Sequence, residues 1–389
     1  MQHGMPIYLD YNATTPLHPE VVKAMQTCLA ENFGNPSSQH SYGQAASRLI
    51  KHARDQVAGL LGCDTDEIIF TSGGTESDNH ALKGLAWANR DHGMHIITSQ
   101  IEHPAILNVC RFLQRHGFEI SYVPVNSYGM LDMDAFAAAI RDDTILVSIM
   151  HANNEVGTLQ PITDISKLCR QHGIALHCDA SQSIGKTACS ISELGVDMLT
   201  VAGHKLYGPK GVGALYVRHG INLEPLLHGA GHELGRRAGT ENITGIVGLG
   251  RACELLAALG DEDYIHMQNL RDRLQHKLED NVPDTRLNGE PVQRLANTLS
   301  LSFLGINANE LLDLLAEKVA VSAGAACHGD KVTVSHVLQA MGVPEEWARG
   351  TIRFSLGIHT TELEIDQASE LVSAAVARLR RKKIGSDQT

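Results

Sequence analysis

Two polar residues that follow apolar segments could share one chemical task. Lys205 lies in a glycine-rich turn between the apolar segments 196–201 and 212–217, which we expect to be strands. A lysine in such a turn is partly desolvated, and desolvation lowers the pKa of an amine that must react with an aldehyde. Asp179 follows a further apolar segment, 174–177. An amine for the aldehyde and a carboxylate for the pyridine nitrogen are the two groups that a pyridoxal phosphate (PLP) enzyme most needs.

The segment Phe70–Glu76, Phe-Thr-Ser-Gly-Gly-Thr-Glu, is typical of an anion site at a strand-to-helix junction. Its two glycines let the backbone approach a ligand closely, and the next helix begins with unpaired N–H groups. Gly74 and Thr75 would then hold a phosphate. An ordinary helix cap by Ser72 or Thr75 would explain the same residues, but the lysine and the aspartate described above favour the phosphate.

Three motifs together resemble those of PLP-dependent cysteine desulfurases of the NifS/IscS type, in the class-V aminotransferase superfamily. In chain order they are Asp179–Gln182 (Asp-Ala-Ser-Gln), Gly203–Gly211 (Gly-His-Lys-Leu-Tyr-Gly-Pro-Lys-Gly) and Ala325–Cys327 (Ala-Ala-Cys). The resemblance runs from about Tyr8 to about Leu379. It implies PLP fold type I, similar to aspartate aminotransferase, and a cytoplasmic enzyme that converts L-cysteine to L-alanine.

The resemblance also assigns roles around the cofactor. It implies that Lys205 binds PLP covalently, that Gln182 donates to the phenolic oxygen of PLP and that His204 helps to bind the phosphate. A serine that completes the phosphate site in the family is replaced here by Ala202. Thr240, in Arg-Ala-Gly-Thr, matches a threonine that the neighbouring subunit supplies, so the resemblance implies a homodimer with shared sites.

Further matches concern the substrate. His103 matches the histidine that stacks on the pyridine ring and transfers protons, although a helix-capping histidine would fit the local sequence equally. Asn154, in His-Ala-Asn-Asn-Glu-Val-Gly, matches an asparagine that reaches the substrate carboxylate and a cofactor oxygen. Arg353 matches the arginine that pairs with that carboxylate, for which a guanidinium suits because it makes two parallel hydrogen bonds.

Cys327 is the candidate nucleophile. Small residues precede it and a polar, glycine-containing stretch follows, which predicts a flexible loop that could carry sulfur as a persulfide to an acceptor protein. The segment Ala325–Asp330 is also similar to the Cys-His-x-Asp loop of selenocysteine lyases, so a selenocysteine lyase is the alternative. A PLP aminotransferase would need no such cysteine, and a non-catalytic sulfur-relay protein would need neither the lysine nor the aspartate.

Bulk composition excludes several other classes. The 389 residues are 43% hydrophobic and 20% charged, with a net charge of −12, so nucleic acid and anionic membranes are not expected partners. No signal peptide or membrane-spanning run is evident, which predicts a cytoplasmic protein. The eight cysteines include no Cys-x-x-Cys pair, and only glycine and alanine separate His228 from His232. We therefore expect neither disulfides nor a metal site.

Strands and amphipathic helices alternate from residue 67 to residue 177, which predicts an α/β domain with a mainly parallel sheet. The glycine-rich stretch 228–241 reads as a functional loop, and a helix follows to residue 259. We expect residues 14–259 to form the large PLP-binding domain. Residues 1–13 and 260–389 would form a smaller α+β domain that carries the cysteine loop. The chain ends at Thr389, before the longer tail with which housekeeping members contact an iron–sulfur scaffold protein, so that partnership stays open.

Overall fold

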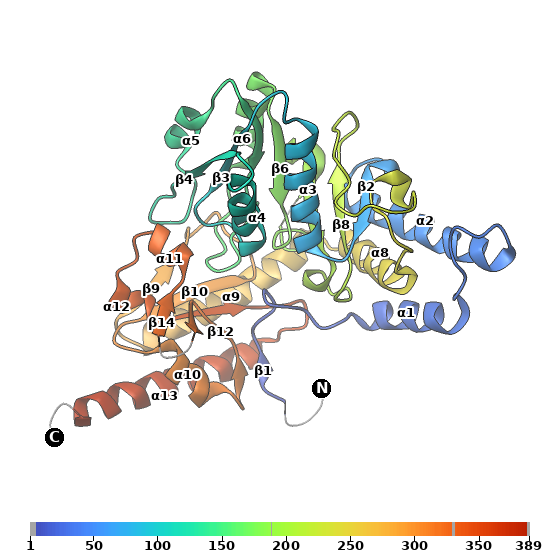
Figure 1. Cartoon of the computed structure of the whole chain (residues 1–389). Coiled ribbons are helices and arrows are strands. Elements are labelled where there is room, and N and C mark those ends of the chain that lie inside the picture. Colours follow the sequence, from blue (N-terminus) through green and yellow to red (C-terminus); the bar gives the residue numbers. More distant parts are fainter. Residues whose placement is uncertain (1–4, 188, 329–330, 387–389) are drawn as a thin grey trace.

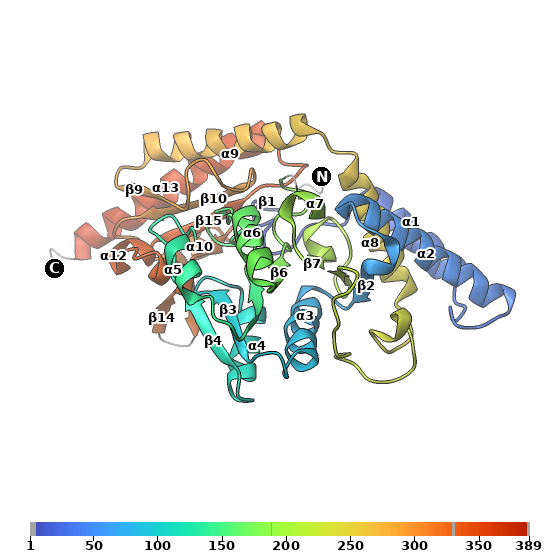
Figure 2. The same cartoon turned by 90° about the horizontal axis from the view of Figure 1, so that it is seen from above.

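The computed structural model describes residues 5–187, 189–328 and 331–386, and for residues 325–333 and 383–386 it describes only the backbone. Figure 1 shows an upper lobe around the larger sheet and a lower lobe that ends in the long helix α13 (Glu362–Ser386). Helices α1 (Pro19–Glu31) and α2 (Ser41–Leu61) extend sideways from the body in both views (Figures 1 and 2).

The upper lobe contains a seven-stranded sheet with the strand order β2-β8-β7-β6-β5-β3-β4. Its strands are β2 (Ile68–Thr71), β3 (His95–Ser99), β4 (Glu119–Val123), β5 (Thr144–Ser148), β6 (Ala175–Asp179), β7 (Met198–Ala202) and β8 (Gly213–Val217). Strands β3 to β7 pair in parallel, whereas β8 is antiparallel to both β2 and β7. The predicted α/β fold with a mainly parallel sheet is confirmed.

Helices cover both faces of this sheet. They are α3 (Gly74–Ala88), α4 (Pro104–Gln114), α5 (Met133–Ala139), α6 (Ile162–His172), α7 (Ile191–Leu194) and α8 (Ile243–Ala257), with 3₁₀ turns η1 (Thr65–Glu67), η2 (Gly203–Lys205) and η3 (Glu233–Gly235). Because successive strand residues point to opposite faces, Leu199 and Val201 pack with α2, α6 and α8, whereas Met198 packs with α3 and α4. Two cores thus form on the two faces.

The lower lobe has its own antiparallel sheet, in the order β12-β15-β10-β9. Its strands are β9 (Thr285–Asn288), β10 (Thr298–Phe303), β12 (Ser322–Ala323) and β15 (Thr351–Ser355), and its helices besides α13 are α9 (Asp261–Asn281), α10 (Ala308–Leu315), α11 (His336–Ala340) and α12 (Glu345–Ala348). Leucines, valines and phenylalanines from α9, α10, α13 and the sheet form one core here.

The start of the chain belongs to the lower lobe. Strand β1 (Ile7–Tyr8) pairs in parallel with β11 (Val319–Ala320), and Leu9 is buried in the core of that lobe. The next residues run toward the large sheet, where the backbone N–H of Thr15 donates to the carbonyl oxygen of His204 at 2.9 Å. This N-terminal segment therefore connects the two lobes.

One local prediction differs from the structure. The stretch around Cys327, expected as a flexible loop, has the backbone of a hairpin in which β13 (Ala325–His328) pairs with β14 (Lys331–Val334). β-Branched residues in 332–334 favour this extended backbone.

Among the described residues, no single helix is long and apolar enough to cross a membrane. Helices α8 and α9 reach the required length and composition only as a pair, and they are bent by 89° relative to each other.

Candidate active site

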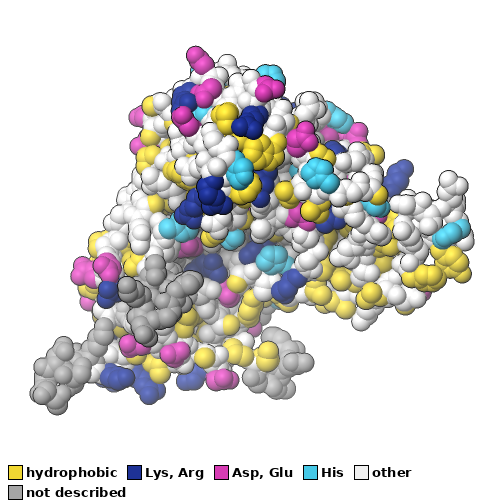
Figure 3. Space-filling model, viewed as in Figure 1, with side chains coloured by type: hydrophobic (Ala, Val, Ile, Leu, Met, Phe, Trp, Pro, Cys, Tyr) yellow, Lys and Arg dark blue, Asp and Glu magenta, His cyan; other side chains and the backbone are white. Residues whose placement is uncertain are grey.

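A cavity of about 420 Å³ lies where the carboxyl ends of β6 and β7 meet the N-terminal segment and β15. Figure 3 shows histidine, lysine and arginine side chains gathered along the band between the two lobes. The lining includes nine of the residues predicted from the sequence: Gly74, Thr75, His103, Asn154, Asp179, Gln182, His204, Lys205 and Arg353. Because β6 and β7 are parallel neighbours, the side chains after their ends meet at one edge of the sheet.

Lys205 ends the short turn η2, which directly follows β7. Its Nζ donates hydrogen bonds to the carbonyl oxygens of Asn12 and Ala13, the latter at 2.8 Å. Burial lowers the pKa of Lys205 from 10.5 to about 8, and the positive charge of Arg353 acts in the same direction. This environment provides the partly desolvated amine that the sequence predicted.

Asp179 is the last residue of β6 and is buried. Its Oδ1 accepts a hydrogen bond from the backbone N–H of Ser181 at 2.9 Å, which fixes the carboxylate at the cavity wall. A second acid, Asp78, also lines the cavity, and its Oδ1 lies 3.8 Å from Nε2 of the buried His177. Burial raises the pKa of Asp78 well above its ordinary value, and Asp179 acts in the same direction. This shift favours the uncharged form of Asp78 beside Asp179.

The amino end of α3 forms the opposite wall. The helix begins at Gly74, and the residue before it, Gly73, makes no side-chain cap. A Cβ at Gly74 would lie 3.1 Å from Oγ of Ser181 and 3.3 Å from Cβ of Ala202, so glycine allows close packing against the strand ends. The first N–H groups of α3 therefore face the cavity as anion donors. The alternative of a cap by Ser72 or Thr75 does not hold.

His204 lies beside these donors. Its Nδ1 is 3.2 Å from Oγ1 of Thr14. Burial lowers the pKa of His204 to about 4, with Lys205 and Lys210 acting in the same direction. The ring is therefore neutral at pH 7 and can donate a hydrogen bond without adding charge.

His103 both caps a helix and lines the cavity. It is the residue that precedes α4, and its Nδ1 accepts a hydrogen bond from the backbone N–H of Ala105 at 3.2 Å, so it caps the helix. It also lines the cavity. The cap uses Nδ1 as acceptor, which places the proton of the neutral ring on Nε2. Burial lowers the pKa of His103 below its ordinary value.

Arg353 lies in β15 and reaches the cavity from the lower lobe. Its Nη2 donates to Oδ1 of Asp10 at 2.7 Å and to Oγ of Ser322 at 3.1 Å, and its Nη1 donates to the carbonyl oxygen of Asn154 at 3.1 Å. Its buried Nε has no partner among the described residues. An unpaired buried donor is costly.

Among the described side chains, Thr240 is not part of this cavity lining. It lines a separate cavity of about 170 Å³, together with Ser72, Gly211 and Arg237. The backbone of Cys327 belongs to β13, and its side chain lies outside the described residues. The roles assigned to both stay predictions.

The sequence reading missed Asn12 and Lys186. Asn12 is buried and lines the cavity, and its carbonyl oxygen accepts from both Lys205 and Gln182. Lys186 is buried behind Gln182. A polar residue within Asp-Tyr-Asn-Ala-Thr-Thr was the available signal for Asn12. The lysine four residues after Gln182 was the signal for Lys186.

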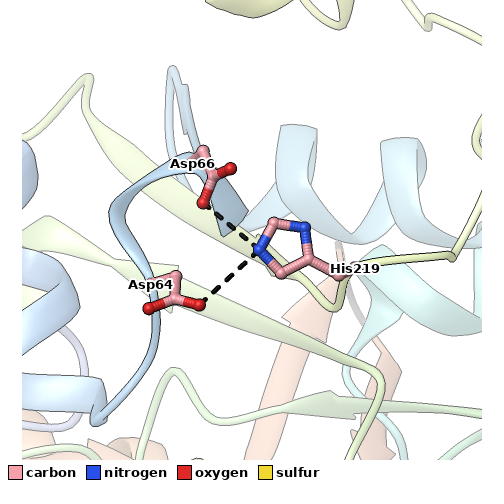
Figure 4. A group of neighbouring side chains, drawn as sticks. All are labelled: Asp64, Asp66 and His219. Carbon is pink, nitrogen blue, oxygen red and sulfur yellow. Dashed lines mark ion pairs between the residues drawn. The ribbon is translucent and has the colours of Figure 1, made fainter.

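A different group of potential ligands lies away from this cavity, where Asp64 and Asp66 of the η1 region approach His219 (Figure 4). The Nε2 atom of His219 is 3.7 Å from Oδ2 of Asp64 and 3.3 Å from Oδ1 of Asp66, and all three residues are exposed. Exposed acidic groups commonly lie close to a histidine without a ligand, and we assign none to this group.

The residues of this cavity fit PLP. The size of the cavity suits a small cofactor. Lys205 supplies a desolvated amine and Asp179 supplies a carboxylate. The N–H groups at the start of α3 suit a phosphate.

Known proteins agree with this assignment. The profile of the aminotransferase class-V family matches residues 7–368. The “Cysteine desulfurase IscS” of Methanosarcina thermophila is 49% identical over 375 residues, which cover 96% of this chain and 93% of that protein. A solved structure of a NifS-like protein has a TM-score of 0.91 at 39% identity and covers 96% of this chain and 100% of that one. A structure of SspA in complex with cysteine has a TM-score of 0.80 at 38% identity, with coverage of 91% and 99%.

The chain belongs to the aminotransferase class-V family. Members of this class are PLP-dependent enzymes of fold type I, so the predicted family, fold type and cofactor are confirmed.

Proposed function

We propose that this enzyme is a cysteine desulfurase, which converts L-cysteine to L-alanine and retains the sulfur as a persulfide on Cys327. One observation carries the proposal: Asp179 at the end of β6, Lys205 in the turn after β7 and Arg353 within β15 line a single cavity. Supporting it, the chain is similar over nearly its whole length to proteins named cysteine desulfurase.

When bound, PLP supplies an electron sink that makes bonds at the substrate's carbon atoms easier to break. Lys205 would hold it covalently, and the carboxylate of Asp179 would keep a proton on the ring nitrogen. Gly74, Thr75 and His204 would hold the phosphate. The neutral His204 and the backbone donors provide hydrogen bonds here without crowding the site with positive charge.

Arg353 and Asn154 would orient the substrate through its carboxylate. The guanidinium is held by Asp10, Ser322 and the Asn154 carbonyl oxygen, which fixes its orientation at the cavity. The free amine of Lys205 would accept the α-proton of the substrate, because a pKa of about 8 suits a general base at neutral pH.

Sulfur transfer would then use Cys327. Its thiolate attacks the substrate sulfur, so that an S–S bond forms while the C–S bond breaks. The electron pair of the C–S bond stays with the carbon skeleton, which takes up protons and leaves as alanine. The Nε2 of His103 is the ring atom that can exchange protons with the cavity, since Nδ1 is engaged by the Ala105 N–H.

A homodimer with shared sites is part of the proposal. Thr240 is exposed on the 228–241 loop and does not line the cavity of its own subunit. The nearby Leu234 is 76% exposed at a positive φ of 57°, a strained position for a leucine that presents an apolar side chain outward. Contact with a second subunit would cover this loop and bring Thr240 to the partner's phosphate. The persulfide would then pass to a sulfur-acceptor protein in the cytoplasm.

A selenocysteine lyase is the second candidate, because the segment Ala325–Asp330 is similar to the loop of those enzymes. Both candidates predict alanine as a product, and they differ in the need for an attacking thiolate. Because alanine keeps the electron pair of the broken bond, selenium leaves at the zero-valent level, and the weaker C–Se bond allows it to depart without attack by Cys327.

The test measures alanine from L-cysteine and from L-selenocysteine, with an added thiol reductant so that the released sulfur or selenium is detected as sulfide or selenide. We expect wild-type enzyme to act on cysteine, and Cys327→Ala to bind PLP, lose this activity and keep activity on selenocysteine. Cys63→Ala is the matched control, because burial raises the pKa of the Cys63 thiol to about 12 and makes it unreactive. A wild-type enzyme that acts on selenocysteine and excludes cysteine would overturn the desulfurase proposal.

A further inference from the structure

Lys186 is a buried lysine to which the mechanism above gives no role. Only 5% of the residue is exposed. Its Nζ donates to Oε1 of Gln182 at 2.8 Å and to Oδ1 of Asn12 at 3.3 Å, so its acceptors are amide oxygens rather than a carboxylate. Burying an ammonium group is costly. A buried lysine that contacts two cavity-lining residues therefore calls for a reason beyond packing.

The contacts of Lys186 determine how the Gln182 amide is oriented. Oε1 of Gln182 accepts from Lys186, while Nε2 donates to the carbonyl oxygen of Asn12 at 3.0 Å. A primary amide has one oxygen and two N–H groups. Reversing it would place its N–H groups against the lysine donor and its oxygen against the Asn12 oxygen. Only the observed orientation satisfies both neighbours, and it leaves the second N–H of Nε2 free for the cavity that Gln182 lines.

We propose that Lys186 is a positioning residue that keeps the Gln182 amide turned with an N–H group toward the phenolic oxygen of bound PLP. The inference rests on the proposed function and on the hydrogen bond to that oxygen that the family resemblance implies for Gln182. Lys186 itself does not line the cavity, so it acts through Gln182.

Asn12 does not depend on Lys186 in the same way. Its Oδ1 also accepts from Nδ2 of Asn297 at 3.2 Å, and its Nδ2 donates to Oγ1 of Thr298 at 2.8 Å. Removing the lysine amine therefore leaves Asn12 held by two other side chains. Gln182 instead loses the donor to its Oε1, so the effect of the substitution falls on Gln182.

The hydrogen bond does not require a charged lysine. Burial lowers the pKa of Lys186 well below its ordinary value, and the charges of Lys205 and Arg353 act in the same direction. A neutral amine still has two N–H groups to donate. The positioning role is thus compatible with either protonation state.

The test is a double-mutant cycle with Lys186→Met, Gln182→Leu and the double variant, read by the visible absorption of bound PLP. The absorption changes with pH as the phenolic oxygen loses its proton. A hydrogen-bond donor stabilises the anionic oxygen and lowers the pH at which the change is half complete, so loss of the donor raises this midpoint. We expect Lys186→Met to raise the midpoint by about one pH unit and the dissociation constant for PLP about tenfold. Gln182→Leu should do the same, and adding Lys186→Met to it should change neither quantity further.

Controls separate this role from a structural one. Lys167→Met removes an exposed lysine charge, paired with Asp164, and should leave the band and PLP affinity unchanged. Lys186→Met replaces the amine with an apolar side chain of similar length, and a wild-type circular dichroism spectrum should show that the variant folds; if it fails to fold, Lys186→Leu replaces it in the cycle. Additive effects of the two substitutions, or an unmoved midpoint in the Lys186 variant, would overturn the inference. Absence of PLP binding by wild-type protein would instead overturn the cofactor assignment, whereas colour without desulfuration overturns only the proposed activity.

Discussion

Attachment of PLP to the cofactor-free protein should become faster as the pH rises through about 8. Only the neutral amine of Lys205 can attack the aldehyde. The pKa of Lys205 is lowered from 10.5 to about 8, mainly by burial and next by the charge of Arg353. The neutral fraction therefore increases across the physiological range instead of far above it.

The size of the effect follows from these two values. At pH 7.5, a lysine with a pKa of about 8 is neutral in roughly a quarter of the molecules, whereas one at 10.5 is neutral in about one molecule per thousand. The buried lysine should thus react roughly two hundred times faster than an exposed one of equal intrinsic reactivity.

Stopped-flow absorbance between pH 6.5 and 9.5 would measure this rate on protein stripped of cofactor. Arg353→Gln removes a charge that lowers the pKa of Lys205, so the midpoint should move upward. Arg349→Gln is the control, because Arg349 is exposed and pairs with Glu345 in α12. A rate that is still rising steeply at pH 9.5 in wild-type protein, or equal midpoints in the two arginine variants, would refute the reasoning.

Four other substitutions give separate expectations. Arg353→Lys keeps the positive charge but cannot make the two parallel hydrogen bonds of a guanidinium, so KM for cysteine should rise about 10- to 100-fold in steady-state assays. A change below twofold would contradict carboxylate binding by Arg353. Asp179→Asn should keep bound PLP yet lower turnover at least about tenfold, because the ring nitrogen loses its anionic partner. Thr240→Ala should increase the dissociation constant for PLP, and a fully active monomer in sedimentation would refute its placement. Glu233→Gln should lower the free energy of unfolding by about 2 kcal/mol in urea titrations, because buried Glu233 accepts two charged hydrogen bonds from Arg54.

The sequence predicted those parts of the site that depend on local pattern. Alternating strands and helices place polar residues after strand ends, and the parallel pairing of β6 with β7 then brings Asp179 and Lys205 to one cavity. The junction at Phe70–Glu76 was recognised for the same reason, since its glycines and the following helix are contiguous.

Long-range packing explains what the sequence could not predict. Nothing near Asn12 indicates that its carbonyl oxygen will contact Lys205, because that contact requires the N-terminal segment to lie between the two lobes. The hydrogen bond of Lys186 to Asn12 likewise depends on the N-terminal segment, so the sequence around Lys186 does not predict it. The sequence predicts a loop around Cys327 because glycine and small residues lie there. The strand-forming residues 332–334 come later in the chain and pair with β13.

The N-terminal segment has a consequence for biosynthesis. Ile7 and Tyr8 pair with Val319 and Ala320, and Asp10 pairs with Arg353, so the N-terminal segment depends on strands that are synthesised much later. Contacts this distant in sequence form late in folding. The strands of the large sheet and Lys205 precede β15 in the chain, so we expect the Asn12 wall of the cavity to close after that sheet has formed.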